Sequence, residues 1–385
     1  MNEAQEAFLG EVRQLLGPPV YINPEEVPFV EISDPDRLCK EPLVSVVCLT
    51  YNHAKYIERA FQGFEEQITN FPVEIIIGED CSTDGALELC KAFQSRHPDQ
   101  VRVLTWNENV GAKANSARCR ASCRGKYIAF CEGDDYWCCP TKLQQQYDYL
   151  EANKACGLIH GNAMVVHPGR TAHACFFNPS KPLPLPLMSG HSVVDMLNDT
   201  CSVVTCTVMI RREVLIQLGV ECPGVYTRVR RLGDFQVWTG MLSRSKAQYL
   251  PEVLAGYVQS GESATRSNNP KKRLLFFCDM IDVFLEINAA FNNSDKGTED
   301  GILRRLSSAL LFVAYRADEK GLVSATVRMR KVLGYRNKFS DSVFSISNDL
   351  HLPFWVALVL LRIIHPPMRV IARFRQGFNH KRNPN

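Results

Sequence analysis

The sequence predicts an α/β fold: a Rossmann-like mixed, mainly parallel sheet flanked by helices, with a C-terminal helical extension. Three observations support this prediction. Continuous apolar, β-branched runs recur from residue 43 onward, as in strands buried on both faces of a sheet. Segments with helical spacing of apolar residues alternate with these runs. The runs end in polar clusters, at the edge where open parallel sheets bind their ligands.

The composition is that of a folded globular protein. The 385 residues are 45% hydrophobic and 22% charged, with a net charge of +3 that does not indicate a nucleic-acid partner. The 15 cysteines form no CxxC pair and mostly lie in apolar runs, which favours a reducing cytoplasm over a disulfide framework. The N-terminal segment lacks the pattern of a signal peptide, and no run reaches the roughly 20 apolar residues that span a bilayer.

The first half of the chain predicts a regular alternation. Residues 1–41 suit a short helix and a proline-rich lead-in, and firm order is expected from Pro42. Strands are expected at 43–50, 73–80, 101–106 and 126–132, and helices at 56–68, 84–95, 112–123 and 141–152. Strand–helix–strand connections imply parallel pairing with right-handed crossovers.

The second half is less regular. The pattern predicts strands at 157–166 and 202–211, a proline-rich loop at 178–187, a helix near 234–243 and an extended segment at 247–257. After about residue 265 the pattern is helical. We therefore expect a lead-in at 1–41, an α/β domain at 42–264 and a helical region with a basic amphipathic tail at 265–385.

Polar residues follow each of the first four strands. The clusters occupy 50–53, 79–84, 107–109 and 132–135. Because parallel strands end at one edge of the sheet, the clusters predict a ligand site there. Simpler interpretations remain open at single positions. Ser82 or Asp84 could cap the next helix, Asn107 and Asn109 could form turns, and 132–135 could be a solvated turn.

The carboxylates of Glu132, Asp134 and Asp135 need a positive partner because like charges repel one another. The chain has neither a GxGxxG fingerprint nor a GxxxxGK[ST] loop, so no glycine loop is expected to hold phosphate. A divalent cation held by carboxylates is the other common way to hold a diphosphate. The sequence thus predicts that these carboxylates bind a metal and that the metal binds a diphosphate.

Four blocks resemble family-2-type, inverting nucleotide-sugar glycosyltransferases of the GT-A fold. They are PLVSVVCLTYNHAKYIERA, EIIIGEDCSTDGA, NENVGAKAN and GKYIAFCEGDDYW, and their order and spacing match over roughly residues 42–260. The resemblance makes 42–264 the catalytic domain. It implies a UDP- or dTDP-linked sugar donor, with UDP favoured. The sugar would pass to a hydroxyl of a glycan or lipid-linked acceptor, as in surface polysaccharide synthesis.

The resemblance also assigns roles to single residues. Thr50 and Asp80 would contact the nucleotide base and ribose. Asp134, the last residue of the DXD-like motif, would bind Mn²⁺ or Mg²⁺, and Glu132 stands where the family has the first Asp. Lys113 lies near a donor-binding basic position, although a helix-surface lysine is an equal interpretation. The expected donor-binding set is Thr50, Tyr51, Asn52, Asp80, Asp84, Lys113, Glu132, Asp134 and Asp135, with Asp134 and Glu132 as metal ligands.

The segment at 230–240 resembles the family's general-base segment and makes Asp234 the candidate base. A carboxylate at a helix start that faces the cleft can take the proton of an attacking hydroxyl, whereas the simpler interpretation is a helix cap. Trp238 could stack on a sugar or pack in the core. His160, Asn162 and residues 205–207 are candidates for the acceptor pocket or for structural roles.

One block departs from the family pattern. Relatives often have Arg after the tyrosine equivalent to Tyr257, followed by a His, whereas this chain has Val258 and Gln259. Arg266 is a candidate substitute. The departure keeps open a non-catalytic relative that binds a nucleotide sugar. A sugar-phosphate nucleotidyltransferase is a third hypothesis, but it needs a glycine-rich, arginine-containing loop after the first strand, which is absent.

The tail at 352–375 combines an apolar run of about ten residues with regularly spaced arginines. It suits an interfacial helix on anionic lipid, which would place a cytoplasmic protein at the inner face of the membrane. A helix packed on the catalytic domain, followed by a basic solvated tail, is the alternative.

Overall fold

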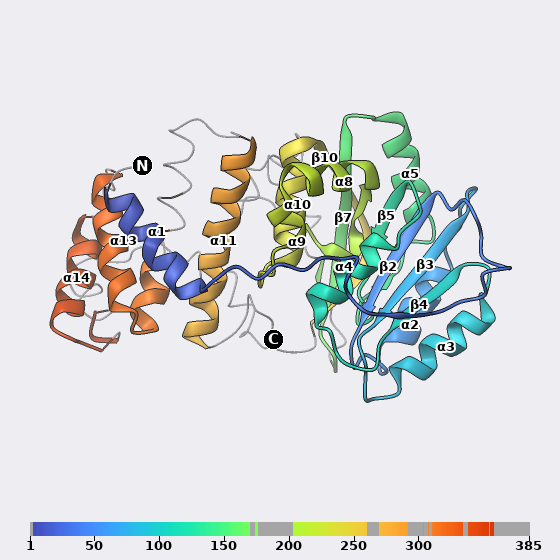
Figure 1. Cartoon of the computed structure of the whole chain (residues 1–385), viewed down its shortest axis with the longest axis horizontal. Coiled ribbons are helices and arrows are strands. Elements are labelled where there is room, and N and C mark those ends of the chain that lie inside the picture. The colour runs from blue at the N-terminus through green and yellow to red at the C-terminus, as the bar shows by residue number, and fades with distance from the viewer. Residues whose placement is uncertain are drawn as a thin grey trace. The chain divides into compact units, whose positions relative to one another are not determined.

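The structure is a computed structural model. It describes residues 3–169, 174–175, 203–259, 269–291, 303, 307, 310–333, 338–353 and 355–357. The expected loop at 178–187, Arg266 and most of the 352–375 tail lie outside these residues. The chain divides into two compact units (Figure 1). The larger comprises Pro19–Ser263 and Asp279–Ile302, and the smaller comprises Met1–Pro18, Ala264–Cys278 and Leu303–Asn385.

The larger unit is built on one sheet, which has ten strands within the described residues. Its strands are β1 (Val30–Ile32), β2 (Val44–Thr50), β3 (Val73–Glu79), β4 (Val101–Thr105), β5 (Tyr127–Phe130), β6 (Tyr136–Trp137), β7 (Cys156–Val166), β8 (Ala174–Cys175), β9 (Met209–Arg211) and β10 (Lys246–Val258). The order is β1-β4-β3-β2-β5-β9-β7-β10-β6, with β8 beside β7.

The long pairings in this sheet are parallel. β4, β3, β2 and β5 form one parallel block, and β7 pairs in parallel with β10. Shorter antiparallel pairings attach β1, β6, β8 and β9. The predicted mixed, mainly parallel α/β architecture is therefore confirmed.

Helices cover both faces of the sheet. The helices are α2 (Ile57–Glu65), α3 (Ala86–Arg96), α4 (Ala112–Ala121), α5 (Lys142–Ala152), α8 (Arg212–Glu221), α9 (Pro223–Thr227), α10 (Gly233–Arg244) and the second half of α11 (Pro270–Phe291). The core joins α2, α3 and α5 to the sheet, and Phe61 stacks on Phe93 with ring centroids 4.1 Å apart. On the other face, α4 packs against β2 and β3.

Buried polar contacts fasten α4 to the ends of the strands. The fully buried Arg118 donates to Asn115 Oδ1 at 3.0 Å and to the carbonyl of Glu79 at 2.9 Å. Asn115 in turn donates to the carbonyl of Gly78 at 2.7 Å. A Cβ at Gly78 would come within 2.4 Å of the Cys119 sulfur, so this close approach needs glycine. The helix that carries Lys113 is thereby held at the edge where β2 and β3 end.

The smaller unit is helical where it is described. It contains α1 (Glu3–Leu16), the first half of α11, α13 (Lys320–Val332) and α14 (Lys338–Asp349). α1 buries Phe8, Leu9 and Val12 and packs against α13 (Figure 1). The helical pattern predicted after residue 265 is therefore confirmed in these segments. In the part of the chain that the structure describes, every helix is too short or too polar to cross a membrane.

The structure corrects three local expectations. The lead-in contains β1, where Glu31 forms two hydrogen bonds with Arg102 of β4. α2 ends before Ile68, which is 66% exposed. The expected strand at 202–211 is a strand only from Met209, because Thr205–Thr207 form a 3-10 turn. Thr207 closes this turn by donating its hydroxyl to the carbonyl of Val204 at 2.7 Å.

Candidate active site

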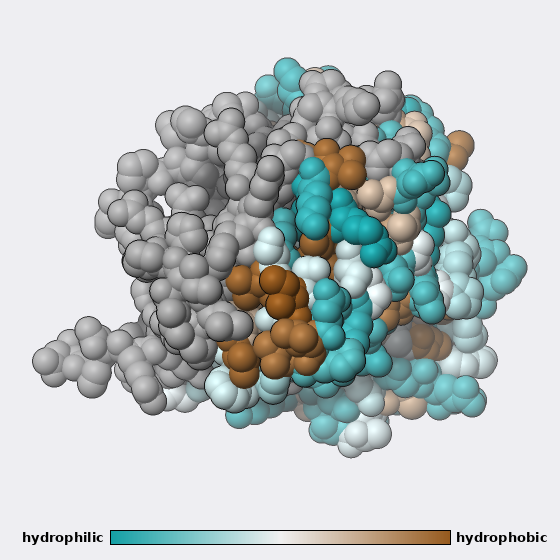
Figure 2. Space-filling view, turned by 90° about the vertical axis from the view of Figure 1, so that its left-hand side faces the viewer, coloured by the Kyte–Doolittle hydropathy of each residue, from teal (hydrophilic) through white to brown (hydrophobic). Residues whose placement is uncertain are grey.

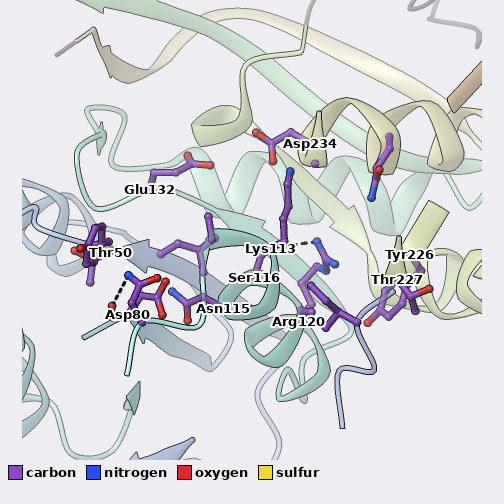
Figure 3. Close-up of a pocket in the computed structure, with 18 of the residues that line it drawn as sticks. Thr50, Asp80, Lys113, Asn115, Ser116, Arg120, Glu132, Tyr226, Thr227 and Asp234 are labelled. Carbon is purple, nitrogen blue, oxygen red and sulfur yellow. Dashed lines mark hydrogen bonds between the residues drawn. The ribbon is translucent and has the colours of Figure 1, made fainter. Parts of the chain in front are cut away.

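A cavity of about 460 Å³ opens where β2, β3 and β5 end. The cavity is bounded by the strand ends, by α4 and by the start of α10 (Figure 3). Six of the predicted site residues line it: Thr50, Tyr51, Asp80, Lys113, Glu132 and Asp234. Residues from five separate parts of the chain thus meet at the edge that the polar clusters indicated.

Thr50 and Asp80 form one end of this cavity. The backbone N–H of Asp80 donates to the carbonyl of Thr50 at 3.1 Å, and Asp80 Oδ1 accepts from the backbone N–H of Val110 at 2.8 Å. The Thr50 hydroxyl is buried and has no hydrogen-bond partner among the described residues. Buried hydroxyls are normally satisfied, so this one is available to a ligand.

Asn52 and Asp84 tie the two strand-end loops together instead of lining the cavity. Asn52 adopts a left-handed conformation with φ of 56°, and its Oδ1 accepts from the backbone N–H of Thr83 at 2.8 Å. Asp84 accepts from the N–H groups of Ala54 at 2.8 Å and Ala86 at 3.1 Å. These contacts favour the helix-start interpretation of Asp84, and the donor-binding role of both residues stays a prediction.

Glu132 is the member of the acidic motif that lines the cavity, and one of its carboxylate oxygens is buried. Its Oε2 has no hydrogen-bond partner among the described residues. Burial, followed by the nearby Asp234 and Asp135, raises the pKa of Glu132 well above its usual range. A carboxyl group in such a place gains free energy from an added cation, because the cation offsets both the desolvation and the repulsion.

The two aspartates of the motif lie outside the cavity lining. The Asp134 side chain is 24% exposed, with its Oδ1 4.0 Å from His53 Nδ1. Asp135 is buried and accepts from the backbone N–H of Val258 at 2.7 Å, which joins the motif to β10. Burial and the charge of Asp134 raise the pKa of Asp135 to about 7. The structure therefore shows Asp135 in a hydrogen bond that links the acidic motif to β10, and its donor-binding role stays a prediction.

Glu132 and Asp134 fit a hard divalent cation. Both supply oxygen ligands, and the unsatisfied Glu132 Oε2 is a free coordination position. Within the described residues, no three His, Cys, Asp or Glu side chains are arranged to hold a metal. The protein would therefore supply two carboxylates, and substrate phosphates and water would complete the set, as is usual for Mg²⁺.

Asp234 is the second residue of α10 and faces the cavity (Figure 3). Its Oδ2 accepts from the hydroxyl of Thr205 at 3.1 Å. The N-cap position is occupied by Leu232 without a side-chain cap, so Asp234 does not perform the capping role that was its simpler interpretation. The orphan N–H groups of the first turn nevertheless favour a carboxylate at this position.

Lys113 of α4 approaches the same turn. A Cβ on Gly233 would overlap its ammonium group, so glycine at that position makes room for the lysine. Burial lowers the pKa of Lys113, and the negative charge of Asp234 opposes this shift. Lys113 therefore lines the cavity near Asp234, and this position differs from that of an exposed lysine on a helix surface.

Three arginines that precede α10 are paired with an acidic row on α11. Arg228 and Arg230 contact Asp282 at 2.9 and 2.7 Å, and Arg231 contacts Asp279 at 3.0 Å. Arg230 also contacts Glu286. These ion pairs fix the loop that presents Asp234.

The remaining candidates have structural contacts. Trp238 is 3% exposed, and its ring lies 5.2 Å from that of Phe130 in an edge-on packing, so it packs in the core. His160 and Asn162 are buried in β7 and do not line the cavity. Thr205 contributes through its bond to Asp234.

Several lining residues were not predicted from the sequence: Ile22, Ser116, Arg120, Tyr226 and Thr227. They come from the lead-in, from α4 and from α9. These three segments share no sequence motif that would indicate that they meet. The one available signal was the spacing of Lys113, Ser116 and Arg120, which places all three on one face of a helix.

Several known proteins are similar to this chain in sequence. Residues 45–219 match the family described as glycosyl transferase family 2. The putative teichuronic acid biosynthesis glycosyltransferase TuaG of Bacillus subtilis is 28% identical over 220 residues, which are 56% of this chain and 79% of TuaG. The uncharacterized protein Rv1520 of Mycobacterium tuberculosis is 42% identical over 108 residues, which are 28% of this chain and only 31% of that protein.

A solved structure shares the fold. The crystal structure of S. aureus TarS 1-349 in complex with UDP-GlcNAc has a TM-score of 0.55 and 17% identity, and the match covers 80% of this chain and 92% of TarS 1-349. The likeness supports the predicted GT-A-type architecture. The four sequence blocks thus assemble around one cavity, and residues 45–219 of the chain match glycosyl transferase family 2.

Proposed function

We propose that this protein transfers a sugar from a UDP-sugar to a hydroxyl group of a glycan or lipid-linked acceptor, with inversion at the anomeric carbon. The observation that carries the proposal is one cavity lined by Thr50, Asp80, Glu132 and Asp234 in a chain whose residues 45–219 match glycosyl transferase family 2. The likeness to TuaG supports surface polysaccharide synthesis as the setting.

The donor would occupy the end of the cavity at Thr50 and Asp80. The free Thr50 hydroxyl and the Asp80 carboxylate offer polar contacts to the base and ribose, and Tyr51 lines the same end. Glu132 and Asp134 would hold Mn²⁺ or Mg²⁺. Such an ion, when bound, stabilises the negative charge of the departing diphosphate.

Asp234 would act as the general base. Its Oδ1 takes the proton of the acceptor hydroxyl, whose oxygen forms the new bond to the anomeric carbon while the bond to the diphosphate breaks. Attack on the face opposite the leaving group inverts the configuration in a single displacement. The Thr205 hydroxyl holds the Asp234 carboxylate in place, and Lys113 supplies a positive charge beside it.

We also propose that the protein is cytoplasmic and lies against the inner face of the membrane. Ile346, Leu350 and Trp355 are 58%, 63% and 66% exposed. Figure 2 shows an exposed hydrophobic area on the face where α13 and α14 lie. Six arginines and lysines and no acidic residue follow Asp349 in the sequence. Exposed apolar groups that are followed in the sequence by positive charges suit an anionic lipid surface.

The test is a panel of nucleotide sugars incubated with the full chain, Mn²⁺ and a membrane extract, with released nucleotide as the readout. Release from one donor that is lost in Asp134→Asn and in Asp234→Asn supports the proposal. Asp148→Asn, which removes an exposed carboxylate on α5, is the matched control. Nucleotide binding without release would favour the non-catalytic relative, and release of pyrophosphate from a nucleoside triphosphate would favour the nucleotidyltransferase.

A further inference from the structure

The cavity continues beyond Asp234 along one face of α4. Lys113, Ser116 and Arg120 occupy positions i, i+3 and i+7 of this helix, and all three line the cavity. Figure 3 shows Thr50 and Asp80 at one end, Arg120, Tyr226 and Thr227 at the other, and Lys113 and Asp234 between them. The proposed donor residues account for the first end and leave the second without a role.

Arg120 is incompletely satisfied at this second end. Its Nη1 donates to the Ser116 hydroxyl at 3.1 Å, and its guanidinium carbon lies 5.2 Å from the centre of the Tyr226 ring. Its Nε is buried and has no hydrogen-bond partner in the part of the chain that the structure describes. Across those same residues, the ion pairs within 4.0 Å include none that involves Arg120.

Other arginines of this unit, unlike Arg120, have carboxylate or carbonyl partners. Arg228 and Arg230 are paired with carboxylates of α11, and Arg118 spends its donors on backbone carbonyls and Asn115. A buried donor without a partner costs free energy, and the Nε of Arg120 is such a donor. The cost at Arg120 is recovered when a ligand supplies an anionic oxygen.

The walls around Arg120 suit a sugar that bears such an oxygen. Tyr226 presents an aromatic ring, Ser116 presents a hydroxyl group and Ile22 adds an apolar contact, whereas the Thr227 hydroxyl donates to the carbonyl of Pro223 at 2.9 Å. A guanidinium group binds carboxylate or phosphate through two parallel hydrogen bonds. Because Asp234 lies between this end and the donor end, a group bound here belongs to the molecule that delivers its hydroxyl to Asp234.

We propose that Arg120, Ser116 and Tyr226 form an acceptor subsite that binds a carboxylate or phosphate group, so that the acceptor is an anionic glycan. This inference rests on the proposed function and deepens it by naming the acceptor class. The same oxyanion chemistry could come from the donor diphosphate, and the experiment separates the two sources.

The experiment titrates the full chain, saturated with UDP and Mn²⁺, with methyl glucuronide, glycerol 3-phosphate and their neutral counterparts methyl glucoside and glycerol, by calorimetry or ligand-observed NMR. We expect at least one anionic probe to bind about tenfold more tightly than its neutral counterpart. Arg120→Gln should remove this preference, and Arg120→Lys should keep part of it. Arg96→Gln, which removes an exposed charge on α3, should leave the preference unchanged.

Two results would overturn the proposal. One is the absence of any preference for the anionic probes in the wild-type chain. The other is a loss of UDP·Mn²⁺ affinity in Arg120→Gln with the preference for the anionic probe intact, which would make Arg120 a donor residue. Thermal melting of each variant identifies a fold defect. If Arg120→Gln is misfolded, the preference of Arg120→Lys for the anionic probe decides whether Arg120 binds it. Failure of the wild-type chain to bind UDP·Mn²⁺ would instead refute the proposed function, and the probes are then titrated without nucleotide.

Discussion

A carboxylate that takes a proton from a sugar hydroxyl must point a free oxygen at it, and the contacts of Asp234 meet this need. Thr205 donates to Oδ2, so the orientation of the group is fixed while Oδ1 stays accessible from the cavity. The hydroxyl that holds Asp234 comes from the 3-10 turn, and the nearby positive charge comes from Lys113 of α4.

Asp234→Asn should lower the rate of sugar transfer by roughly 10²- to 10⁴-fold, because an amide cannot accept the proton. The affinity for UDP and Mn²⁺ should stay within about twofold, since Asp234 is not a predicted donor ligand. Transfer assays and nucleotide titrations on the same preparation measure both quantities. A parallel loss of nucleotide affinity would show that Asp234 binds the donor.

Thr205→Val should lower kcat by about tenfold and leave the KM for the donor almost unchanged, because it frees the carboxylate to rotate without removing it. Thr205→Ser retains the hydroxyl and should restore most of the rate. A Thr205→Ser variant as slow as Thr205→Val would assign the effect to packing and not to the hydrogen bond.

Sequence reasoning correctly located cavity residues that follow directly from a strand, and their binding roles stay predictions. Thr50 and Asp80 were predicted because a buried apolar run fixes where the strand ends and which residues come next. Arg120 and Tyr226 were not predicted, because their meeting depends on how α4 and α9 pack, and this packing leaves no local pattern. Asp84 is a different case, since backbone N–H groups use both of its oxygens and its donor-binding role stays a prediction.

At the scale of elements, α10 depends on α11 for its position. The row formed by Asp279, Asp282 and Glu286 lies on one face of α11 and pairs with the arginines before α10. Asp282→Asn should lower the free energy of unfolding by about 3 kcal/mol, because it leaves the buried Arg230 short of a counter-charge. Chemical denaturation measures the loss, with Asp148→Asn as the exposed control. A change below about 0.5 kcal/mol would mean that Glu286 alone suffices.

A buried lysine on α5 makes stability depend on pH. Lys142 is fully buried, donates to Gln146 Oε1 at 2.9 Å and lies over the Trp137 ring. Burial lowers the pKa of Lys142 to about 7. The unfolded chain therefore binds more protons than the folded chain between about pH 7 and the ordinary lysine pKa of about 10.4, and stability rises with pH across this window.

Lys142→Met should remove this rise, and at pH 7 it should leave the chain as stable as the wild type or more stable. Melting temperatures of both proteins from pH 6.5 to pH 9.5 provide the measurement. An equal pH slope in the two proteins would show that Lys142 does not cause it.

Among the elements, length decided what the sequence could predict. The four strands of the parallel block were predicted because each carries a long apolar run. β1 and β6 were missed, since three and two residues hold no periodicity and these strands exist only through pairing with β4 and β10. The turn at Thr205–Thr207 was mistaken for a strand because its β-branched residues favour strands, whereas side-chain bonds impose the turn.

At the scale of the whole molecule, exposed apolar residues on α14 and beyond it predict membrane association. The double substitution Leu350→Ser with Trp355→Ser should reduce co-sedimentation with phosphatidylglycerol vesicles several-fold, because it removes the apolar contact and leaves the basic charge. Ile68→Ser, which changes an equally exposed residue of the larger unit, should have no effect. Unchanged binding by the double variant, or equal binding to phosphatidylcholine vesicles, would contradict the proposal.

The hydrogen bond between Asp135 and Val258 joins residues that lie 123 positions apart in the chain. During synthesis the acidic motif leaves the ribosome long before Val258 does. In that interval the Asp135 carboxyl group lacks the backbone N–H of Val258 as its hydrogen-bond donor. A nascent chain can thus form the parallel block β4-β3-β2-β5 early, yet it cannot complete the acidic motif until β10 has been made. Products of premature termination before residue 258 would lack the hydrogen bond from Val258 to Asp135. Cellular proteases should therefore remove them faster than the complete protein.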